Sequence, residues 1–392
     1  MLRILRLLTA GESHGQALVA ILEGMPAGLP ILAEAIDRDL VRRQHGYGRG
    51  GRMKIEQDRA QILSGIRHGR TLGGPIAILI ANRDWANWDK VMATGPADPA
   101  EAGHRALTRP RPGHADLAGA LKHGTHDARD VLERASARET AARVAAGAVA
   151  RRLLEEFGIG VRSHTLSVGP AAHPPGVAKT WDEIGAAEGS ALRCADPEVE
   201  RRMVEEIDRA KAAGDTIGGA FEVAARGVPP GLGSHRQWDT RLSARLLAAV
   251  GSIPSIKGVA IGAGDTAPAA QGTVFHDPIA WDAAGRRFTR ASNHAGGIEG
   301  GISNGEEIRV RAWVKPLSTL PRALPSVDLV TKEPFAAQVE RSDVTAIAAA
   351  GVVGESMTAL VIADAFLEKF GGDSLPETAR NHAGFVRQLR DF

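Results

Sequence analysis

The chain has 392 residues, of which 43% are hydrophobic and 24% charged, so it can bury a large core and lacks the composition of a disordered protein. A formal net charge of +2 and an aromatic content of 4% argue against a nucleic-acid-binding module, which needs a basic surface and rings that stack on bases. Cys194 is the single cysteine, which excludes an intramolecular disulfide and any CxxC-type metal site and fits a reducing compartment.

The first residues, "MLRILRLLTAGESHG", place Arg3 and Arg6 inside a very short apolar stretch. This pattern predicts a first strand and not a secretory signal peptide, which would need a longer apolar region and a cleavage site. No uninterrupted apolar run approaches the roughly 18 residues of a membrane helix. We therefore expect a cytoplasmic protein that does not enter a membrane.

Helices are predicted where apolar residues recur at helical spacing between capping residues. The predicted helices cover residues 33–44, about 127–157, about 197–213, 239–250 and 355–370. In the second of these Asp127 is the expected cap and Gly158 the stop. In the third, Asp196 caps the helix and Pro197 takes its first turn, and the expected buried stripe is Val199, Met203 and Ile207.

Strands are predicted at 16–22, 75–80, 161–168, 217–226 and 308–314. The last alternates cleanly, with Ile308, Val310, Ala312 and Val314 on one face. Strands and helices do not alternate regularly, which favours an α+β fold over a doubly wound parallel sheet. We expect a single catalytic domain over residues 1–375 and a polar, only partly ordered tail over 376–392.

Two basic stretches lie on segments rich in glycine or proline. The first runs from Asp39 to Glu56 and the second from Glu101 to Asp116, and neither contains an acidic residue between its ends. Arginines on such loops suit a small polyanion, because guanidinium groups bind phosphate and carboxylate through two parallel hydrogen bonds. The alternative is a solvated basic surface.

Three short stretches place a histidine or an acid beside these loops: "GESHG" (11–15), "RPRPGHAD" (109–116) and "RSD" (341–343). They supply His14, His114 and Asp343. Like charges from nearby arginines disfavour an imidazolium, so we expect the two histidines to be neutral acid/base groups near pH 7. A structural role is the alternative for each histidine alone.

The segment "ERASARET" (133–140) places Arg134 and Arg138 one helical turn apart. On one helix they share a face, which predicts a cationic surface suited to phosphate. The alternative is pairing of these arginines with Glu133 and Glu139.

Standard phosphate-loop, dinucleotide and metalloprotease signatures are missing from the sequence. "HGTHD" (123–127) could suggest a metal site, but Asp127 is better used as a helix cap and no third ligand stands out. We expect no metal.

Nine motifs occur in an order that resembles the chorismate synthase family, over about residues 1–375. They are "GESHG", "GYGRGGRMKIE" (46–56), "SGIRHGRTLGGPI" (64–76), "RPRPGHAD", "ERASARETAARVAAGAVAR" (133–151), "GDTIGG" (214–219), "SNHAGGIEGGISNG" (292–305), "KPLSTLPRAL" (315–324) and "RSDVTAIAAAGVVGESM" (341–357).

The resemblance implies conversion of 5-enolpyruvylshikimate-3-phosphate to chorismate and phosphate by anti-1,4-elimination. It also implies a requirement for reduced FMN without net redox change. The expected fold is a β-α-β sandwich with helices between antiparallel sheets, and the expected assembly is a homotetramer. Because the sequence has no added reductase domain, we expect an external source of reduced flavin.

Residue by residue, the resemblance implies that His14 is the acid for the leaving phosphate and that His114 supports the charge of the reduced flavin. Asp343, through Ser13, would take the proton associated with flavin N5. The implied substrate contacts are Arg43, Arg49, Arg52, Arg111, Ser136, Ala137 and Arg138. The implied flavin contacts are Arg134, Ala135, Ser136, Pro254, Ser255, Gly300, Lys315, Pro316, Leu317, Ser318, Thr319 and Arg341. Pro254 and Ser255 depart from the family's usual amide residue followed by Ala, and Leu317 from a smaller polar or β-branched residue.

"SNHAGGIEGGISNG" precedes the strand that leads to Lys315. We interpret it as a backbone-lined wall against the flavin, because glycines permit close approach and unusual dihedral angles. A flexible connector is the alternative for this loop. For the whole chain, the competing functions are a nucleic-acid-binding module and a non-catalytic flavin or anion binder.

Overall fold

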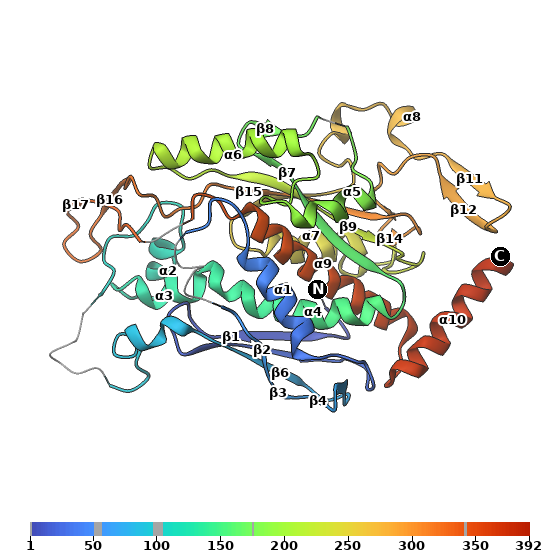
Figure 1. Cartoon of the computed structure of the whole chain (residues 1–392), viewed down its shortest axis with the longest axis horizontal. Coiled ribbons are helices and arrows are strands. Elements are labelled where there is room, and N and C mark those ends of the chain that lie inside the picture. Colours follow the sequence, from blue (N-terminus) through green and yellow to red (C-terminus); the bar gives the residue numbers. More distant parts are fainter. Residues whose placement is uncertain (1, 51–56, 97–104, 175, 341–342) are drawn as a thin grey trace.

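Two antiparallel sheets enclose a layer of helices, as Figure 1 shows. The computed structural model describes residues 2–50, 57–96, 105–174, 176–340 and 343–392, and every structural statement below concerns these residues. The arrangement is the expected α+β fold, a β-α-β sandwich with its helices between the sheets.

The first sheet has the strand order β1-β2-β6-β3, with β1 at Arg6–Ala10, β2 at Ala17–Glu23, β6 at Ile76–Ala81 and β3 at Gln61–Ser64. Alternate residues of the two central strands are buried, for example Leu18 and Leu22 in β2 and Ile78 in β6. This one-sided burial is the period-two pattern of a sheet packed on a core. It confirms the strands predicted at 16–22 and 75–80.

The second sheet has the order β10-β15-β9-β7-β8, with β10 at Ile256–Ile261, β15 at Ile308–Val314, β9 at Gly219–Arg226, β7 at Gly160–Val168 and β8 at Ala171–Ala172. The prediction for residues 308–314 is confirmed in both bounds and facing, since Ile308, Val310, Ala312 and Val314 are buried.

The helices of the middle layer are α1 at Ala33–Gln44, α4 at Thr140–Glu155, α7 at Leu242–Gly251 and α9 at Ile347–Phe370. α4 packs on the first sheet and on α9, and α9 packs on β7 and β9 of the second sheet. α9 begins at Ile347, earlier than the predicted residue 355. It is long and apolar enough to cross a membrane. However, 94% of its most apolar 18-residue stretch is buried inside the fold, as in the core helix of a soluble protein.

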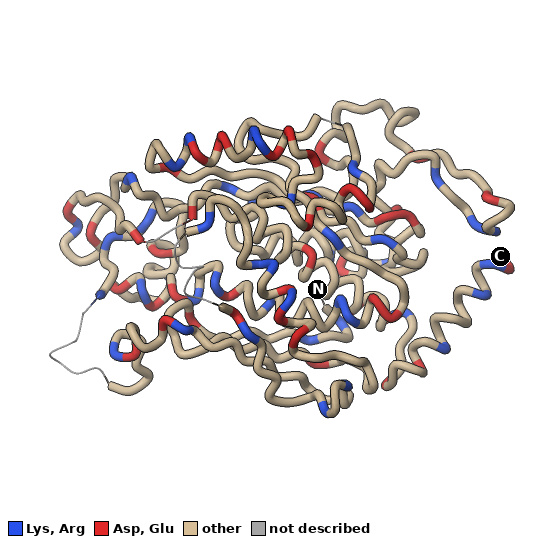
Figure 2. The backbone as a smooth tube through the Cα atoms, in the orientation of Figure 1, with Lys and Arg blue, Asp and Glu red and all other residues tan. Residues whose placement is uncertain are grey.

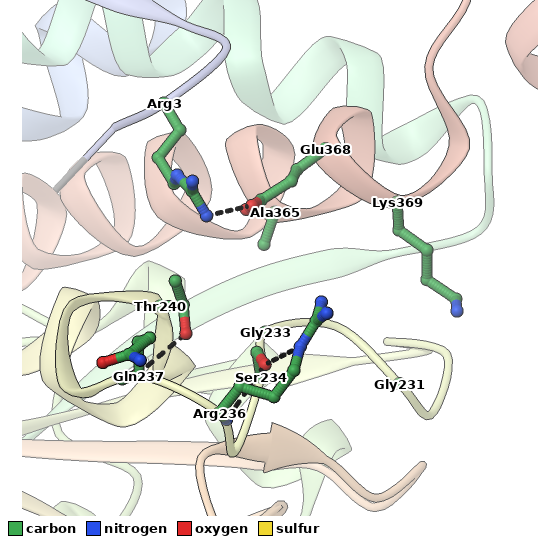
Figure 3. Close-up of a pocket in the computed structure, with 10 residues that line it drawn as sticks. All are labelled: Arg3, Gly231, Gly233, Ser234, Arg236, Gln237, Thr240, Ala365, Glu368 and Lys369. Carbon is green, nitrogen blue, oxygen red and sulfur yellow. Dashed lines mark hydrogen bonds and ion pairs between the residues drawn. The ribbon is translucent and has the colours of Figure 1, made fainter.

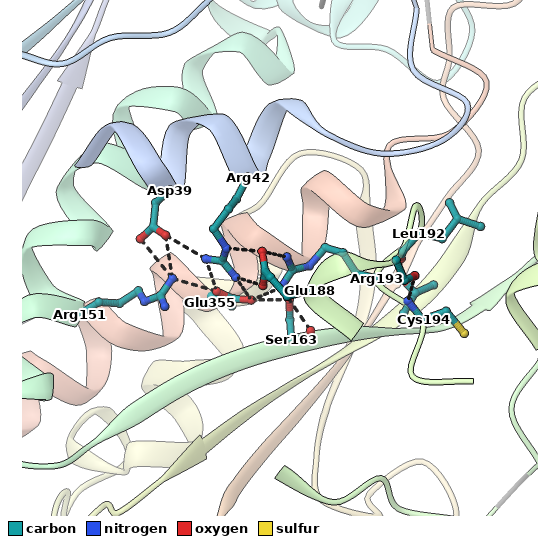
Figure 4. Close-up of polar contacts among 11 residues, drawn as sticks. Asp39, Arg42, Arg151, Ser163, Glu188, Leu192, Arg193, Cys194 and Glu355 are labelled. Carbon is teal, nitrogen blue, oxygen red and sulfur yellow. Dashed lines mark hydrogen bonds and ion pairs between the residues drawn. The ribbon is translucent and has the colours of Figure 1, made fainter. Parts of the chain in front are cut away.

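Buried charges hold this layer together, as Figure 4 shows. Glu355 of α9 has no exposed side-chain surface and contacts Arg42, Arg151 and Arg193 at 2.8–3.0 Å. The Ser163 hydroxyl donates a further hydrogen bond to Glu355 at 2.8 Å. The network links α1, α4, α9, β7 and the segment before α6.

α6 at Pro197–Ala212 lies outside the second sheet and confirms its prediction in detail. The Asp196 carboxylate accepts the backbone N–H groups of Glu198 and Val199. The buried residues of α6 are Val199, Met203 and Ile207, as predicted.

The single helix predicted over 127–157 is wrong. The structure has α3 at Arg129–Ala135, a short 3-10 helix at Ala137–Glu139, and then α4. Ser136 is extended (φ −66°, ψ 144°), and its hydroxyl accepts the N–H of Arg138. This side-chain hydrogen bond competes with the helical one and starts a new helix. Arg134 and Arg138 therefore do not share a helix face, contrary to the prediction.

The expected partly ordered tail is also corrected, because α10 covers Leu375–Asp391. His382 of α10 packs edge-on against Phe370 of α9, with ring centroids 5.0 Å apart.

The remaining α-helices and strands are α2 at Asp116–His123, α5 at Trp181–Ala186, α8 at Gly272–Phe275, and strands β4 Ile66–Arg67, β5 Arg70–Thr71, β11 Ile279–Asp282, β12 Arg287–Arg290, β13 Ile298–Glu299, β14 Ile302–Ser303, β16 Pro325–Val327 and β17 Pro334–Ala336.

Candidate active site

The loop after β1 carries His14 and is held against α3 by backbone contacts. The N–H of Ser13 donates to the Glu133 carbonyl at 2.9 Å, and the N–H of His14 donates to the Glu133 carboxylate at 2.9 Å. Nδ1 of His14 lies 3.0 Å from both carboxylate oxygens of Glu133. The indole of Trp88 stacks on the imidazole, with centroids 3.9 Å apart and planes inclined by 22°.

Glu133 is itself buried and bound by Arg129, whose Nη1 lies 2.9 Å from its carboxylate. Burial alone would raise the pKa of Glu133, but the hydrogen bonds from His14 and Arg129 outweigh it and hold the pKa below its usual value. The carboxylate therefore stays ionised beside the imidazole.

His114 has a corresponding partner in Asp116, the first residue of α2. The His114 Nδ1 and an Asp116 oxygen are in hydrogen-bond contact, and Asp116 also accepts the Arg111 Nε–H at 2.8 Å and the Arg111 backbone N–H at 3.0 Å. Burial opposes ionisation of Asp116, but the contacts with His114 and Arg111 lower its pKa well below the usual range.

The expectation that like charges from arginines act on the two histidines leaves out their carboxylate partners. Each imidazole touches a buried carboxylate through Nδ1, so the argument from like charges does not describe these surroundings. Glu133 lies 119 residues from His14 along the chain, whereas Asp116 is only two residues from His114.

The predicted arginine cluster forms around Asp58, which is 1% exposed. The Asp58 carboxylate accepts Arg43 Nη2 at 2.7 Å and Arg138 Nη1 at 2.6 Å. Arg138 Nε also donates to the Asn82 amide oxygen at 2.9 Å. The Asn82 amide nitrogen in turn donates to the carbonyls of residues 12 and 15, which ties the arginine cluster to the histidine loop.

The charged groups of this cluster shift one another's pKa values. Burial and the like charges of Arg138 and Arg49 lower the pKa of Arg43, although Asp58 opposes them. Burial would raise the pKa of Asp58, but Arg43 and Arg138 lower it. A group of guanidiniums gathered in this way is suited to a ligand that brings its own anionic oxygens.

Asp343 lies beside this cluster. It accepts the Gly50 N–H at 2.6 Å and pairs with Arg49 Nη1 at 3.0 Å. Arg52 and Arg341, predicted substrate and flavin contacts, lie outside the described residues.

The segment of Lys315–Thr319 joins the His114 loop. Lys315 Nζ donates to the Gly113 carbonyl at 2.7 Å, and Arg111 Nη1 donates to the Thr319 hydroxyl at 2.9 Å. On the other side, the Leu317 carbonyl accepts the Thr216 hydroxyl at 2.7 Å, and Pro316 and Ser318 lie within the same segment. Burial, with Lys257 nearby, lowers the pKa of Lys315.

Pro254 and Ser255 form the turn between α7 and β10. The Ser255 carbonyl accepts the Lys315 N–H at 2.9 Å, and Ser255 has a left-handed φ of 71°. This turn therefore lies next to the Lys315 segment, as the flavin prediction requires.

The predicted residues 134–137 lie on both sides of the helix break at Ser136. Arg134 is exposed and points to the first strand, donating to the carbonyls of Thr9 at 2.9 Å and Gly11 at 3.1 Å. Ala135 and Ser136 are half-buried and Ala137 is exposed, next to the buried Arg138.

Gly300 is not brought to the Lys315 segment within one chain. It lies in the tight turn between β13 and β14, and the neighbouring Gly296 packs on Gly262 and on the Arg309 carbonyl at the start of β15. Lys315 follows the other end of that strand. Seven residues of β-strand span about 20 Å.

Two cavities lie outside this group of predicted site residues. A cavity of about 520 Å³ lies between the end of α9 and the loop after β9, lined by Arg3, Arg236 and Lys369 among others, as Figure 3 shows. It is at the opposite end of the 24-residue α9 from Asp343, about 35 Å along the helix. A smaller one of about 320 Å³ adjoins Arg42 and Arg193 of the buried ionic network.

Sequence reasoning therefore found the histidines and arginines but missed the groups that hold them, namely Glu133, Asp116, Asp58, Asn82 and Trp88. Asp116 lies in the motif "RPRPGHAD" and Glu133 in "ERASARET", so both could have been predicted as partners of the histidines. Asp58 and Asn82 carry no local signal.

A cluster of arginines and two carboxylate-bound histidines is an arrangement typical of enzymes that act on small anionic substrates. The family model for chorismate synthase matches residues 5–367. The chorismate synthase of Solibacter usitatus is 54% identical over 394 residues, covering 99% of this chain and all of the relative. That of Symbiobacterium thermophilum is 55% identical over 390 residues, covering 98% and 99%.

A solved crystal structure of chorismate synthase superposes with a TM-score of 0.80 at 42% identity, over the full length of both chains. The chain belongs to the chorismate synthase family. It is thus a carbon–oxygen lyase of the shikimate pathway, which leads to the aromatic amino acids.

Proposed function

We propose that the protein converts 5-enolpyruvylshikimate-3-phosphate to chorismate and phosphate by anti-1,4-elimination. A ring C–H bond and the C–O bond to phosphate break, a new ring double bond forms, and phosphate leaves. When bound, reduced FMN supplies transient electron density that loosens the C–O bond and is recovered without net redox change. The observation that carries the proposal is the pair of buried arginines Arg43 and Arg138, which Asn82 ties to the loop of the carboxylate-bound His14.

In this proposal the arginines bind the substrate's phosphate and carboxylates. Arg43 and Arg138 are already fixed by Asp58, so little reorganisation accompanies binding. Arg49, Arg52, Arg111, Ser136 and Ala137 complete the substrate contacts. Of these, Arg111 is bound to Asp116 and Thr319, so it would act from the boundary between substrate and flavin.

His14 is the proposed acid for the leaving phosphate, and a positioned acid of this kind contributes about 10²–10⁴-fold in rate. His114 supports the charge of the reduced flavin, and Asp343, through Ser13, takes the proton associated with flavin N5. Arg49 and the Gly50 N–H hold the Asp343 carboxylate in place for this role.

The proposed flavin contacts are Lys315–Thr319, Pro254, Ser255, Arg134, Ala135, Ser136, Arg341 and Gly300. The partly buried Lys315 ammonium and the hydroxyls of Ser318 and Thr319 form a donor set that fits a phosphate-bearing group. Since Gly300 lies at the opposite end of β15, its proposed contact requires a neighbouring copy of the chain. We propose a homotetramer in the cytoplasm, supplied with reduced FMN by an external source.

A nucleic-acid-binding role is not favoured by the distribution of charge. Figure 2 shows Lys/Arg and Asp/Glu interspersed along α6 instead of gathered by sign. Arginines that gather do so around buried acids, Arg43 and Arg138 at Asp58 and three others at Glu355.

The test is an anaerobic assay of chorismate and phosphate release with chemically reduced FMN. We expect turnover by the wild type, and a loss of at least about tenfold for His14→Ala and for His114→Ala with the fold retained by circular dichroism. With NADPH and oxidised FMN alone we expect no product. Near wild-type rates for both variants would refute the assigned roles, and NADPH-driven turnover would refute the external flavin source.

A further inference from the structure

The carboxylate of Glu133 is almost wholly enclosed by groups that fix its direction. Its side chain is 1% exposed, and it accepts hydrogen bonds from the His14 backbone N–H, from Arg129 Nη1 and from the His14 ring, at 2.9–3.0 Å. We propose that Glu133 is a positioning residue for His14, which holds the proton on Nδ1 and directs Nε2 toward the leaving phosphate. The inference rests on the proposed role of His14.

The ring geometry supports this assignment. The two imidazole nitrogens point away from each other, so a ring bound through Nδ1 presents Nε2 on its other side. Within the described part of the chain, Nε2 of His14 makes no hydrogen bond, and 16% of the side chain is exposed. Nε2, which carries the transferable proton when the ring is an imidazolium, is thus left for a ligand.

Trp88 fixes the remaining freedom of the ring. Its indole lies flat on the imidazole and is held in turn by a hydrogen bond from Nε1 to Asp84 at 3.1 Å. Rotation of the His14 ring would lose both this stacking and the contact with Glu133. The stacking on Trp88 therefore sets the position of the His14 ring, and the contact with Glu133 sets its tautomer.

The charges around His14 come from three segments. Glu133 and Arg129 belong to α3, Arg105 lies over Trp88 at 4.5 Å from the ring centroid, and Glu340 lies 3.5 Å from Arg129. Only Glu133 touches the imidazole among these described residues. Its neutralisation would leave Arg129 beside the ring and disfavour the imidazolium that donates the proton.

The arrangement occurs twice, which argues against coincidence. Arg111, Asp116 and His114 form the same sequence of arginine, buried carboxylate and imidazole Nδ1 on a different loop. In both cases an arginine binds the carboxylate and the carboxylate binds the ring, as in sites where a carboxylate fixes a catalytic imidazole.

The experiment compares Glu133→Gln, Glu133→Asp, His14→Ala and the double variant Glu133→Gln/His14→Ala in steady-state assays with reduced FMN. We expect Glu133→Gln to lower kcat at least tenfold with less than a threefold change in KM. The alkaline limb of its pH–rate profile should move to lower pH. Glu133→Asp should recover part of the lost rate, because it restores the charge.

Glu222→Gln is the matched control. Glu222 is also a buried carboxylate that contacts an imidazole, that of His164, and two arginines, but it lies in β9 of the second sheet. We expect this variant to lose stability while its kcat stays within twofold of the wild type and its pH profile is unchanged.

In the double variant, Glu133→Gln should change the rate of His14→Ala by less than twofold, because a positioning residue acts only through its partner. Fully additive losses, or an unchanged kcat in Glu133→Gln, would overturn the inference. A readout independent of turnover is the tautomer of His14 in protein labelled with ¹⁵N-histidine, where the Nδ1–H form should predominate in the neutral ring and decline in Glu133→Gln. An unaltered tautomer would also overturn the inference, whereas failure of the wild type to form chorismate would overturn the proposed function.

Discussion

At the scale of single residues, the fold depends on buried acids whose partners lie far away in the sequence. Glu355 is the clearest case, since burial alone would raise its pKa, but Arg42, Arg193 and Arg151 together lower the pKa to about 2. The partners come from three other segments of the chain. A pattern of spacing along the sequence cannot reveal such a set, which explains why the arginines were predicted by motif and the acids that bind them were missed.

The depressed pKa of Glu355 makes stability depend on pH. Because the folded pKa is about 2 and the unfolded pKa about 4.5, the contribution is complete above pH 4.5 and is lost as pH falls toward 2. Glu355→Gln should lower the free energy of unfolding at pH 7 by about 3 kcal/mol, since it leaves one buried and two partly buried guanidiniums without this carboxylate. It should also flatten the pH dependence between 4.5 and 2.

Urea unfolding at a series of pH values measures both effects. Glu205→Gln, which removes an exposed partner of Arg201 on α6, is the control and should match the wild type within error. Parallel pH curves for Glu355→Gln and the wild type would contradict the assignment.

At the scale of elements, the predictions succeeded where a regular pattern ended at a capping residue, as in α6, and failed where a side chain interrupted the pattern. The run 127–157 has helical composition throughout, and only the hydroxyl of Ser136 bonding to the Arg138 N–H divides it. The site depends on this break, because it sends Arg138 inward to Asp58. Helix propensity favoured a continuous helix, and a local hydrogen bond from the backbone to the Ser136 side chain interrupts it.

The crossing of α4 and α9 depends on Gly147, where a Cβ atom would lie 2.4 Å from the Ser356 Cβ and 2.7 Å from its Cα. Gly147→Ala should therefore destabilise the protein, by about 1–3 kcal/mol if the helices must shift. Gly384→Ala in α10 is the matched control, because its Cβ would meet only the end of Arg387 at 3.8 Å. It should stabilise by up to about 1 kcal/mol. Thermal unfolding of both variants checks the prediction, and equal shifts in the same direction would contradict it.

At the scale of the whole molecule, the sandwich and its two antiparallel sheets followed from the mixed strand and helix pattern and from the family resemblance. The position of Gly300 did not. Gly300 precedes β15 by a few residues, which suggested that it would lie near Lys315. However, Gly300 lies near the start of β15, and Lys315 follows the end of that strand. Gly300 has no atom within 4 Å of an added Cβ and faces open space.

If Gly300 contacts the flavin of a neighbouring copy, two defective chains should complement each other. Gly300→Val and Lys315→Ala are each expected to bind FMN at least about tenfold more weakly and to turn over slowly. Mixed tetramers, refolded together from equal amounts, should contain some sites with both residues intact and regain a measurable fraction of activity. Light scattering should give about 165 kDa for four chains of 41.2 kDa. Mixtures no more active than the separate variants would contradict shared sites.

The tether between Arg134 and the first strand has a mechanical consequence. Arg134 binds Thr9 and Gly11, and the backbone of Ser13 and His14 binds Glu133 one residue away on the same helix. The loop is therefore bound to α3 both at its start, near Thr9 and Gly11, and at Ser13 and His14. The loop and α3 should move as one rigid body. Any closure around a ligand that displaces His14 carries its carboxylate partner along, so the alignment of the proton donor would survive motions that change its distance from the arginines.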